Sequence, residues 1–229
     1  VTGVQTCALP IYVLDLSRYY QGHGDYDTTE TMALQKEAFL RIAHIVRNQP
    51  EVKCISISGS NAFPNGGGFY GHNFFADTTQ AAMEKGAYAQ WTLNYAEDGS
   101  QFFQTYGMKD ARNGEELVVP PGVADRGQCF ISAELAKRLF GTVEVVGKKI
   151  FLGGKDISEE IAGVFEDYKH RNYNQPLPLV VRFKKELAAT FGFLEYAIVL
   201  RLKEGVDAKA FESRFMKEVA PQLKQGNYY

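Results

Sequence analysis

The chain has 229 residues, of which 45% are hydrophobic and 23% charged, and its formal net charge at pH 7 is -2. This composition is ordinary for a globular protein and excludes long disordered tracts and fibrous repeats. Lys and Arg are scattered rather than gathered into a stripe, so we expect no nucleic-acid partner. The length suffices for one large or two small domains. The 16 Phe and 13 Tyr residues favour a substantial content of β-sheet.

Residues 1–11, VTGVQTCALPI, match the translation of a common sequencing-library adaptor along the whole segment. A match of this length is more specific than any short protein motif, so we leave the segment out of the fold prediction. The alternative interpretation is a genuine edge strand that ends at Pro10. An adaptor implies that the natural sequence starts near Tyr12 and leaves open whether a signal or membrane helix preceded it. No apolar run in the chain approaches the roughly 20 residues that span a bilayer.

The first predicted elements are a helix and a strand. Residues 28–48 predict an amphipathic helix that ends before Pro50. Residues 52–58 predict a strand with Ile55 and Ile57 on the side that we expect to face the core. The apolar face of the helix repeats at helical spacing and consists of Leu34, Ala38, Ile42 and Ile45.

The character of the sequence changes over residues 59–127, where glycine, asparagine and aromatic residues dominate. We interpret this stretch as a second, smaller unit rich in sheet and loops. Order returns with a predicted strand over residues 128–131 and a short helix after it. Ser132 is the predicted N-cap of this helix and Gly141 its end. The predicted buried stripe of the helix is Leu135, Leu139 and Phe140.

Three more strands and a last helix complete the prediction. The strands cover residues 157–166, 179–183 and 195–202. Asp207 can cap a helix that buries Phe211, Phe215 and Val219 and that ends at Pro221. Helices and strands mix without the repeated strand-helix units of a parallel sheet, so the predicted fold class is α+β.

Polar side chains give no pattern that points to catalysis or metal binding. His23, His44, His72 and His170 are far apart and lack metal-ligand spacing. The cluster of Glu166, Asp167, Lys169, His170 and Arg171 is interpreted as a solvated loop. An acid-base pair of Asp167 and His170 is the less favoured alternative. We therefore predict no catalytic, cofactor-binding or metal-binding residues and no cofactor.

Two further features have structural interpretations. The glycine run NGGGF, residues 65–69, is favoured as a turn over a phosphate-binding loop, because no Lys-Ser or Lys-Thr follows it. Cys54 and Cys129 both lie in predicted strands and are favoured as two buried thiols, with a disulfide between them left open. The doublets Phe74-Phe75 and Phe102-Phe103 are expected to be buried.

The stretch from Phe130 to Asn172 resembles the extracytoplasmic domain of MacB-type (FtsX-like) ABC transporter permeases. A helix motif of that family is filled by Ser132, Ala136, Lys137, Phe140 and Gly141, a turn motif by Gly147 and Lys148, and a strand motif by Gly163, Val164 and Asp167. The turn departs from the family pattern at residues 144–146, Glu-Val-Val, where Asn-Pro-Ile is usual. The segment QFFQTYGMKDARNGEE and the early helix and strand extend the resemblance more weakly.

The resemblance implies a periplasmic domain of a permease in the inner (cytoplasmic) membrane. It implies a porter-like part, residues 12–58 and 128–229, into which residues 59–127 are inserted. A separate cytoplasmic ATPase, a second permease copy and in some cases a periplasmic partner protein are the implied partners, and relay of motion is the implied role. Ser132, Gly141, Gly147 and Gly163 are expected to be structural: the serine caps a helix, two glycines form turns, and Gly163 allows close approach of another backbone.

Two other functions remain open on the residues alone. A surface-binding or periplasmic binding module predicts an exposed aromatic patch within residues 59–127. A secreted hydrolase predicts a pocket that gathers Asp167, His170 and a nucleophile.

Overall fold

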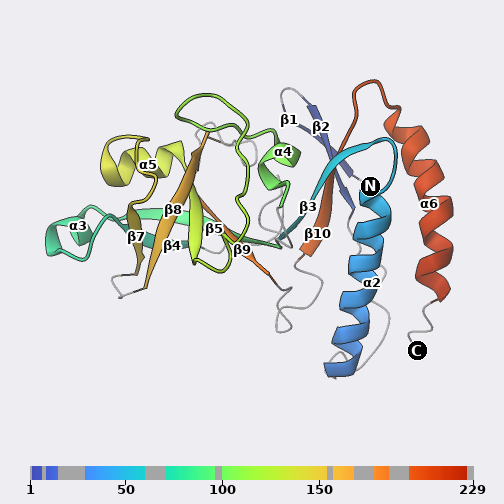
Figure 1. The fold of residues 1–229 in the computed structure, drawn as a ribbon, viewed down its shortest axis with the longest axis horizontal. Coiled ribbons are helices and arrows are strands. Elements are labelled where there is room, and N and C mark those ends of the chain that lie inside the picture. Colours follow the sequence, from blue (N-terminus) through green and yellow to red (C-terminus); the bar gives the residue numbers. More distant parts are fainter. Residues whose placement is uncertain are drawn as a thin grey trace. The chain divides into compact units, whose positions relative to one another are not determined.

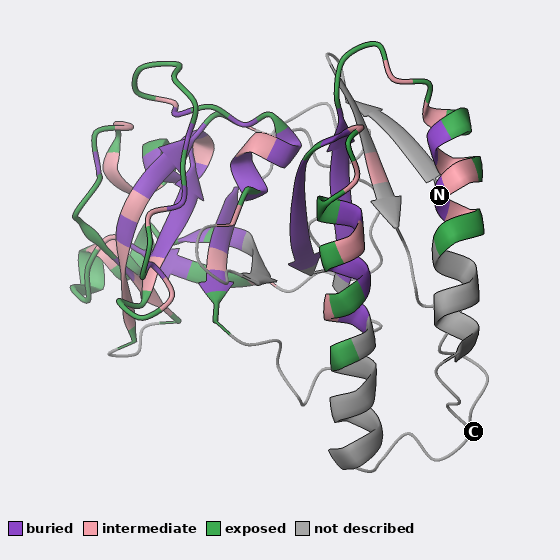
Figure 2. Cartoon of the chain, turned by 45° about the vertical axis from the view of Figure 1, so that its right-hand side comes forward, coloured by how far each residue is buried: buried purple, intermediate pink, exposed green. Residues whose placement is uncertain are grey.

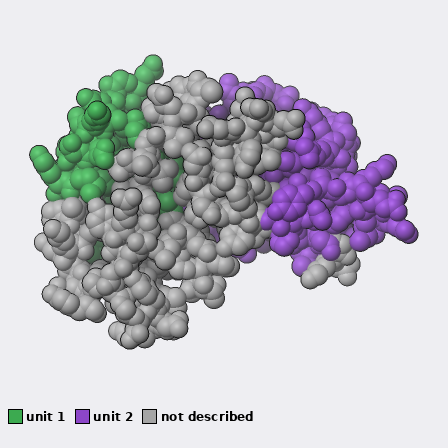
Figure 3. All heavy atoms as spheres, turned by 180° about the vertical axis from the view of Figure 1, so that it is seen from behind, with its two compact units in different colours: residues 1–57, 187–229 green, residues 58–186 purple. Residues whose placement is uncertain are grey.

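The computed structural model describes residues 2–6, 9–14, 29–59, 71–95, 100–153, 157–167, 178–185 and 196–225. The chain divides into two compact units (Figure 3). The first unit contains residues 1–57 and 187–229, and the second contains residues 58–186. Mixed helices and strands confirm the predicted α+β class.

The described residues of the first unit form a small sheet and two helices (Figure 1). Its strands follow the order β1-β2-β10-β3, and the β1–β2 and β2–β10 pairs are antiparallel. Both helices lie on the same side of these strands in Figures 1 and 2. The elements are β1 (Thr2–Thr6), β2 (Leu9–Leu14), α2 (Thr29–Arg47), β3 (Val52–Gly59), β10 (Tyr196–Leu202) and α6 (Ala208–Gln225).

Helix α2 confirms the predicted helix, but its buried face differs from the predicted one. Ile42 is buried as expected, whereas Ile45 is only half-buried. The described buried side chains lie at positions i, i+3, i+4 and i+7, which is the narrow stripe of a helix packed on one side (Figure 2). They are Phe39, Ile42, Ala43 and Val46. The side chains of Leu34 and Ala38 lie outside the described residues.

Strand β3 confirms the predicted strand, and Ile55 and Ile57 are buried as expected. The opposite side is buried as well, because Val52 and Cys54 are at most 7% exposed. Strand β10 is likewise buried on both sides from Ala197 to Leu202. Burial on two sides is typical of a strand in the middle of a structural layer, and alternation along one sequence does not reveal it.

Helix α6 begins after Asp207, as predicted. The Asp207 carboxylate accepts hydrogen bonds from the backbone N–H groups of Lys209, at 2.9 Å, and Ala210, at 3.1 Å. The rings of Phe211 and Phe215 stack 5.6 Å apart on the buried side. The predicted end at Pro221 is wrong, because α6 continues to Gln225. Proline removes one backbone donor, which kinks or weakens a helix without always ending it.

The segment left out of the prediction forms two strands. β1 pairs antiparallel with β2, and β2 in turn pairs with β10 through Tyr12 and Leu200. The edge strand of the alternative interpretation ends at Thr6, and Pro10 lies in the second strand rather than at the end of the first. The adaptor origin of residues 1–11 stays a prediction.

In the second unit, the described residues form a closed ring of six strands and three short helices (Figure 1). The order β5-β4-β7-β8-β6-β9 closes because β9 pairs with β5. The β5–β9 and β6–β8 pairs are parallel and the others are antiparallel. The elements are β4 (Gly71–Phe75), α3 (Gln80–Glu84), β5 (Ala87–Tyr95), α4 (Phe102–Tyr106), β6 (Gln128–Ser132), α5 (Ala133–Phe140), β7 (Lys149–Leu152), β8 (Ser158–Phe165) and β9 (Leu179–Lys184).

Two groups of apolar side chains form the core of this unit. One joins the strands to α5 through residues such as Phe74, Ile131, Leu135, Ile161 and Val180. The other is aromatic, with ring centroids 4.7 to 6.2 Å apart, and consists of Phe102, Phe103, Phe130, Phe165 and Phe183. Both phenylalanine doublets are buried, as predicted.

The second unit extends further along the chain than the expected insertion. The expected porter-like part includes residues 128–229, whereas contacts group residues 128–186 with the unit that starts at Ser58. The reason is strand pairing, since β6 lies between β8 and β9, and β9 pairs with β5. The ring cannot close without residues from both sides of the expected boundary. The division into a porter-like part and an insertion stays a prediction.

Candidate functional site: the junction at the end of strand β8

Ser132 fixes two segments to the start of α5. Its hydroxyl accepts a hydrogen bond from the backbone N–H of Leu135, at 3.3 Å, which is the predicted N-cap interaction. The same oxygen accepts a second one from the backbone N–H of Leu179, at 3.1 Å, at the first residue of β9. Ser132 is fully buried, so both N–H groups depend on this one oxygen.

Asp167 provides a second contact with the same helix end. Its carboxylate accepts a hydrogen bond from the backbone N–H of Glu134 at 2.7 Å. A carboxylate at a helix N-terminus is favoured because the N–H groups there lack partners within the helix. The described structure thus gives Asp167 a helix-capping role. Its less favoured acid-base partner, His170, lies outside the described residues.

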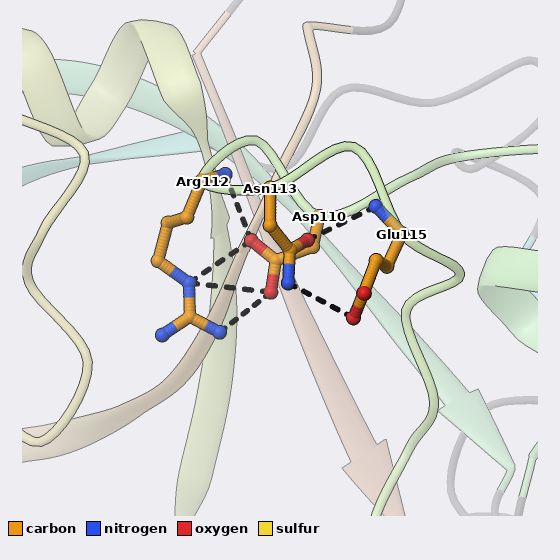
Figure 4. A network of polar contacts seen from close by, with 4 residues as sticks. All are labelled: Asp110, Arg112, Asn113 and Glu115. Carbon is orange, nitrogen blue, oxygen red and sulfur yellow. Dashed lines mark hydrogen bonds and ion pairs between the residues drawn. The ribbon is translucent and has the colours of Figure 1, made fainter.

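A tight turn over residues 110–115 forms the third part (Figure 4). The backbone N–H of Asp110 donates to the carbonyl of Glu115, and that of Gly114 donates to the carbonyl of Asp110, both at 2.8 Å. The guanidinium of Arg112 grips the Asp110 carboxylate through two nitrogens, at 2.5 to 3.2 Å. These bonds hold the pKa of the Asp110 carboxyl below its ordinary value. Asn113 binds Glu115 through both ends of its side-chain amide.

This turn is attached to the end of β8. The backbone N–H of Ala111 donates to the carbonyl of Val164, and the N–H of Glu166 donates to the carbonyl of Lys109, both at 2.9 Å. Asp110 also forms an isolated bridge with Phe165. The end of β8 therefore connects the turn on one side with the N-terminus of α5 on the other. We call this assembly the β8 junction and define it as residues 109–115, 132–135, 164–167 and 179.

The three glycines of the expected structural set have separate roles. Gly141 and Gly147 have φ angles of 74° and 82°, in the left-handed region that favours glycine, and each ends or turns a segment. Gly163 is a contact position: a Cβ atom there would lie 2.7 Å from the ring of Phe130. The atoms nearest to such a Cβ belong to the side chains of Phe130 and Leu117, and the expected approach of another backbone stays a prediction.

Among the described residues, Cys54 and Cys129 are buried thiols that form no disulfide, and they belong to different units. Burial raises the pKa of the Cys129 thiol well above its ordinary value, and the nearby charge of Glu159 adds to this rise. Arg182 pairs with Glu159 at 2.7 Å. A buried thiol with a raised pKa is a packing group and a poor nucleophile.

Other predicted features give no additional site. His44 and His72 are exposed, whereas His23, His170 and the glycine run 65–69 lie outside the described residues. No group of His, Cys, Asp and Glu among the described residues is arranged to hold a metal ion. In the described part of the chain, no helix is both long and apolar enough to cross a membrane.

Part of this junction is predictable from the sequence, namely the N-cap at Ser132, whereas the contacts of Asp110, Arg112 and Asp167 are not. Ser132 was found because an N-cap signal is local. Asp110 and Arg112 were not singled out, although Asn113-Gly114 is a turn signal next to them. The contact of Asp167 with Glu134 joins residues 33 positions apart, and no local pattern announces it.

Comparisons with solved structures find chains that are similar to this one. The periplasmic region of MacB from Actinobacillus actinomycetemcomitans matches with a TM-score of 0.54 at 10% identity, covering 93% of this chain and 83% of that one. A domain of a putative permease protein from Porphyromonas gingivalis matches at 0.49 and 19% identity, covering 78% and 74%. The extracellular domain of the noncanonic ABC-type transporter YknZ from Gram-positive bacteria matches at 0.49 and 15%, covering 81% of each chain.

A comparison of the amino-acid sequence with protein-family models identifies the family of this chain. Comparison with curated proteins yields no significant match. The family model described as the MacB-like periplasmic core domain matches residues 27–217, which include the second unit, part of the first unit and the whole β8 junction. The chain therefore belongs to the MacB-like periplasmic core domain family, whose members are periplasmic domains of MacB-like ABC transporter permeases.

Proposed function

We propose that this chain is a non-catalytic domain of an ABC transporter permease, that it faces the periplasm, and that it relays motion driven by ATP hydrolysis. The family match over residues 27–217 supports the assignment to a permease. The observation that carries the relay role is the β8 junction, in which the polar groups that bind one another join a strand end, a helix end and a turn. Such a body passes on a displacement instead of absorbing it.

The proposed relay requires partners outside this chain. A separate cytoplasmic ATPase supplies the energy and acts through membrane-spanning regions of the permease. A second permease copy provides the element against which the domain moves. The output is either efflux of a substrate or a change in a periplasmic partner protein.

Two other functions find less support. A surface-binding module requires an exposed aromatic patch, but the described aromatic side chains between residues 71 and 106 are mostly buried. Tyr88 is 56% exposed, whereas Phe74, Phe75, Phe102, Phe103 and Tyr106 are at most 8% exposed. For a hydrolase, the carboxylate of Asp167 accepts from the N-terminus of α5, which is a structural role.

Distance measurements in the intact permease test the relay. Spin labels at Lys137→Cys, an exposed position on α5, report the separation between the two permease copies assembled with their ATPase. We expect this separation to differ between the nucleotide-free and ATP-bound states. The control is a pair of labels within the second unit, at Lys137→Cys and Glu116→Cys, whose separation should stay constant. An inter-copy separation that is the same in both states would contradict the relay.

A further inference from the structure

The turn of the β8 junction contains a dipeptide of special reactivity, Asn113-Gly114. Glycine has no side chain, so its backbone nitrogen can approach the side-chain carbonyl carbon of the asparagine before it. Both residues are exposed to water, and Gly114 has a φ of 75°. Spontaneous loss of the side-chain amide is the reaction that this arrangement allows.

The reaction has two steps and needs only water. The backbone nitrogen of Gly114 loses its proton to a base and attacks Cγ of Asn113, forming a C–N bond. The bond from Cγ to Nδ2 breaks, and Nδ2 leaves as ammonia with protons taken from water. Water then opens the resulting five-membered imide at either carbonyl, which gives aspartate or isoaspartate. No electrons are transferred to another molecule.

The turn opposes each of these movements. The N–H of Gly114 donates to the carbonyl of Asp110 at 2.8 Å, so the attacking nitrogen is engaged. Oδ1 of Asn113 accepts from the backbone N–H of Glu115 at 3.0 Å, and Nδ2 donates to the Glu115 carboxylate at 3.1 Å. The attack therefore requires the turn to open first.

Asp110 is the residue that closes the turn, and Arg112 holds it. Asp110 binds Gly114 and Glu115 through its backbone and Arg112 through its carboxylate. Its side chain is only 6% exposed, and that of Arg112 is 32% exposed. We propose that Asn113 is a deamidation site whose rate is limited by the Asp110–Arg112 ion pair.

Conversion of Asn113 would weaken the β8 junction. The new carboxylate would stand where Nδ2 now donates to Glu115, so two negative charges would replace a hydrogen bond. An isoaspartate would also lengthen the backbone between Asp110 and Glu115, whose N–H···O=C bond closes the turn. The modification would thus irreversibly weaken the attachment of the turn, residues 110–115, to the end of β8.

Peptide mapping by mass spectrometry tests the proposal. The purified chain is kept at mildly alkaline pH, folded or unfolded in urea, and the aspartate and isoaspartate forms of the peptide with Asn113 are counted. We expect deamidation to be at least about tenfold slower in the folded chain, because it waits for local opening. Asn65-Gly66, the other such dipeptide in the sequence, monitors the reaction conditions in the same digest.

Arginine variants test whether the Asp110–Arg112 ion pair limits the rate of deamidation at Asn113. Arg112→Ala should speed deamidation of the folded chain about two- to fivefold, in line with a partly exposed ion pair. Arg214→Ala removes a similarly exposed arginine, paired with Glu51 in the first unit, and should leave the rate unchanged. Equal rates in folded and unfolded chains overturn the proposal. So does an Arg112→Ala variant that keeps its circular dichroism and reacts at the wild-type rate. If Arg112→Ala does not fold, Arg112→Lys, which loses the two-nitrogen grip, must lie between wild type and the unfolded chain.

Discussion

Gly163 leaves no space for a side chain in the second unit. A Cβ atom there would lie 2.7 and 2.8 Å from two ring carbons of Phe130 and 3.3 Å from Leu117. Because Phe130 is fully buried within the aromatic group, it cannot move aside. We expect Gly163→Ala to lower the free energy of unfolding by about 1–3 kcal/mol, measured by urea denaturation.

Gly71→Ala is the matched control for this substitution. Its Cβ would meet the hydroxyl end of Tyr88, which is 56% exposed and can rotate into water. We therefore expect little change in the free energy of unfolding. If the two variants are equally stable, the space around Gly163 is not as described.

Asp110 makes stability depend on pH in a defined direction. Hydrogen bonds from Arg112 lower its pKa in the folded chain from the ordinary value of 3.8. The unfolded chain therefore takes up the proton first as pH falls, and the stabilisation is complete only above 3.8. We expect the stability difference between wild type and Asp110→Asn to be constant from neutral pH to that value, then to shrink as pH falls through the lowered pKa.

Urea denaturation across this pH range measures the difference. Asp125→Asn is the comparison, because Asp125 pairs with Lys185 while both side chains are more than half exposed, and such pairs stabilise little. If the difference in unfolding free energy between wild type and Asp110→Asn stays the same in strong acid, the ion pair with Arg112 is not the source of that difference.

Among the elements, helix α5 begins at a single side chain, Ser132, that binds two separate segments of the backbone. Ser132→Ala removes the acceptor for the N–H groups of Leu135 and Leu179, and the site is buried. We expect it to cost about 1–3 kcal/mol of unfolding free energy. Thr79→Ala removes the same type of cap from α3, which has no buried residues, and should cost only about 0.5 kcal/mol. Equal costs would contradict the double role of Ser132.

Elements with local signals were predictable from the sequence. Ser132 and Gly141 bracket α5, and Asp207 precedes α6, because caps depend on a few neighbouring residues. The short helices α3 and α4 were not predicted, since five residues are too few to show helical periodicity. The signal at Pro221 predicted the end of a helix, but this proline lies inside α6.

At the scale of the whole molecule, the two units follow from pairings between distant strands. β5 pairs with β9, and the partners Gln90 and Leu179 are far apart in the sequence. The hydrophobic pattern of a strand does not reveal which distant strand it pairs with, so the sequence alone does not show that residues 128–186 group with the unit that starts at Ser58. Only part of the β8 junction could be predicted, for the same reason. The N-cap at Ser132 depends on neighbouring residues, whereas the other hydrogen bonds of the junction join segments that are distant in the sequence.

Chemical labelling of the intact permease shows on which side of the membrane the domain lies. The intact permease carrying Lys137→Cys is produced with its ATPase, and wall-stripped cells with an intact membrane are treated with a membrane-impermeant maleimide. Cys54 and Cys129 are buried, and the signal of the exposed position on α5 is the labelling above that of the permease without Lys137→Cys, which also contains Cys7. A cysteine on the ATPase serves as the cytoplasmic control. Labelling at position 137 before lysis, with the ATPase labelled only after lysis, is the result that we predict. Labelling at position 137 only after lysis would contradict a domain that faces the periplasm.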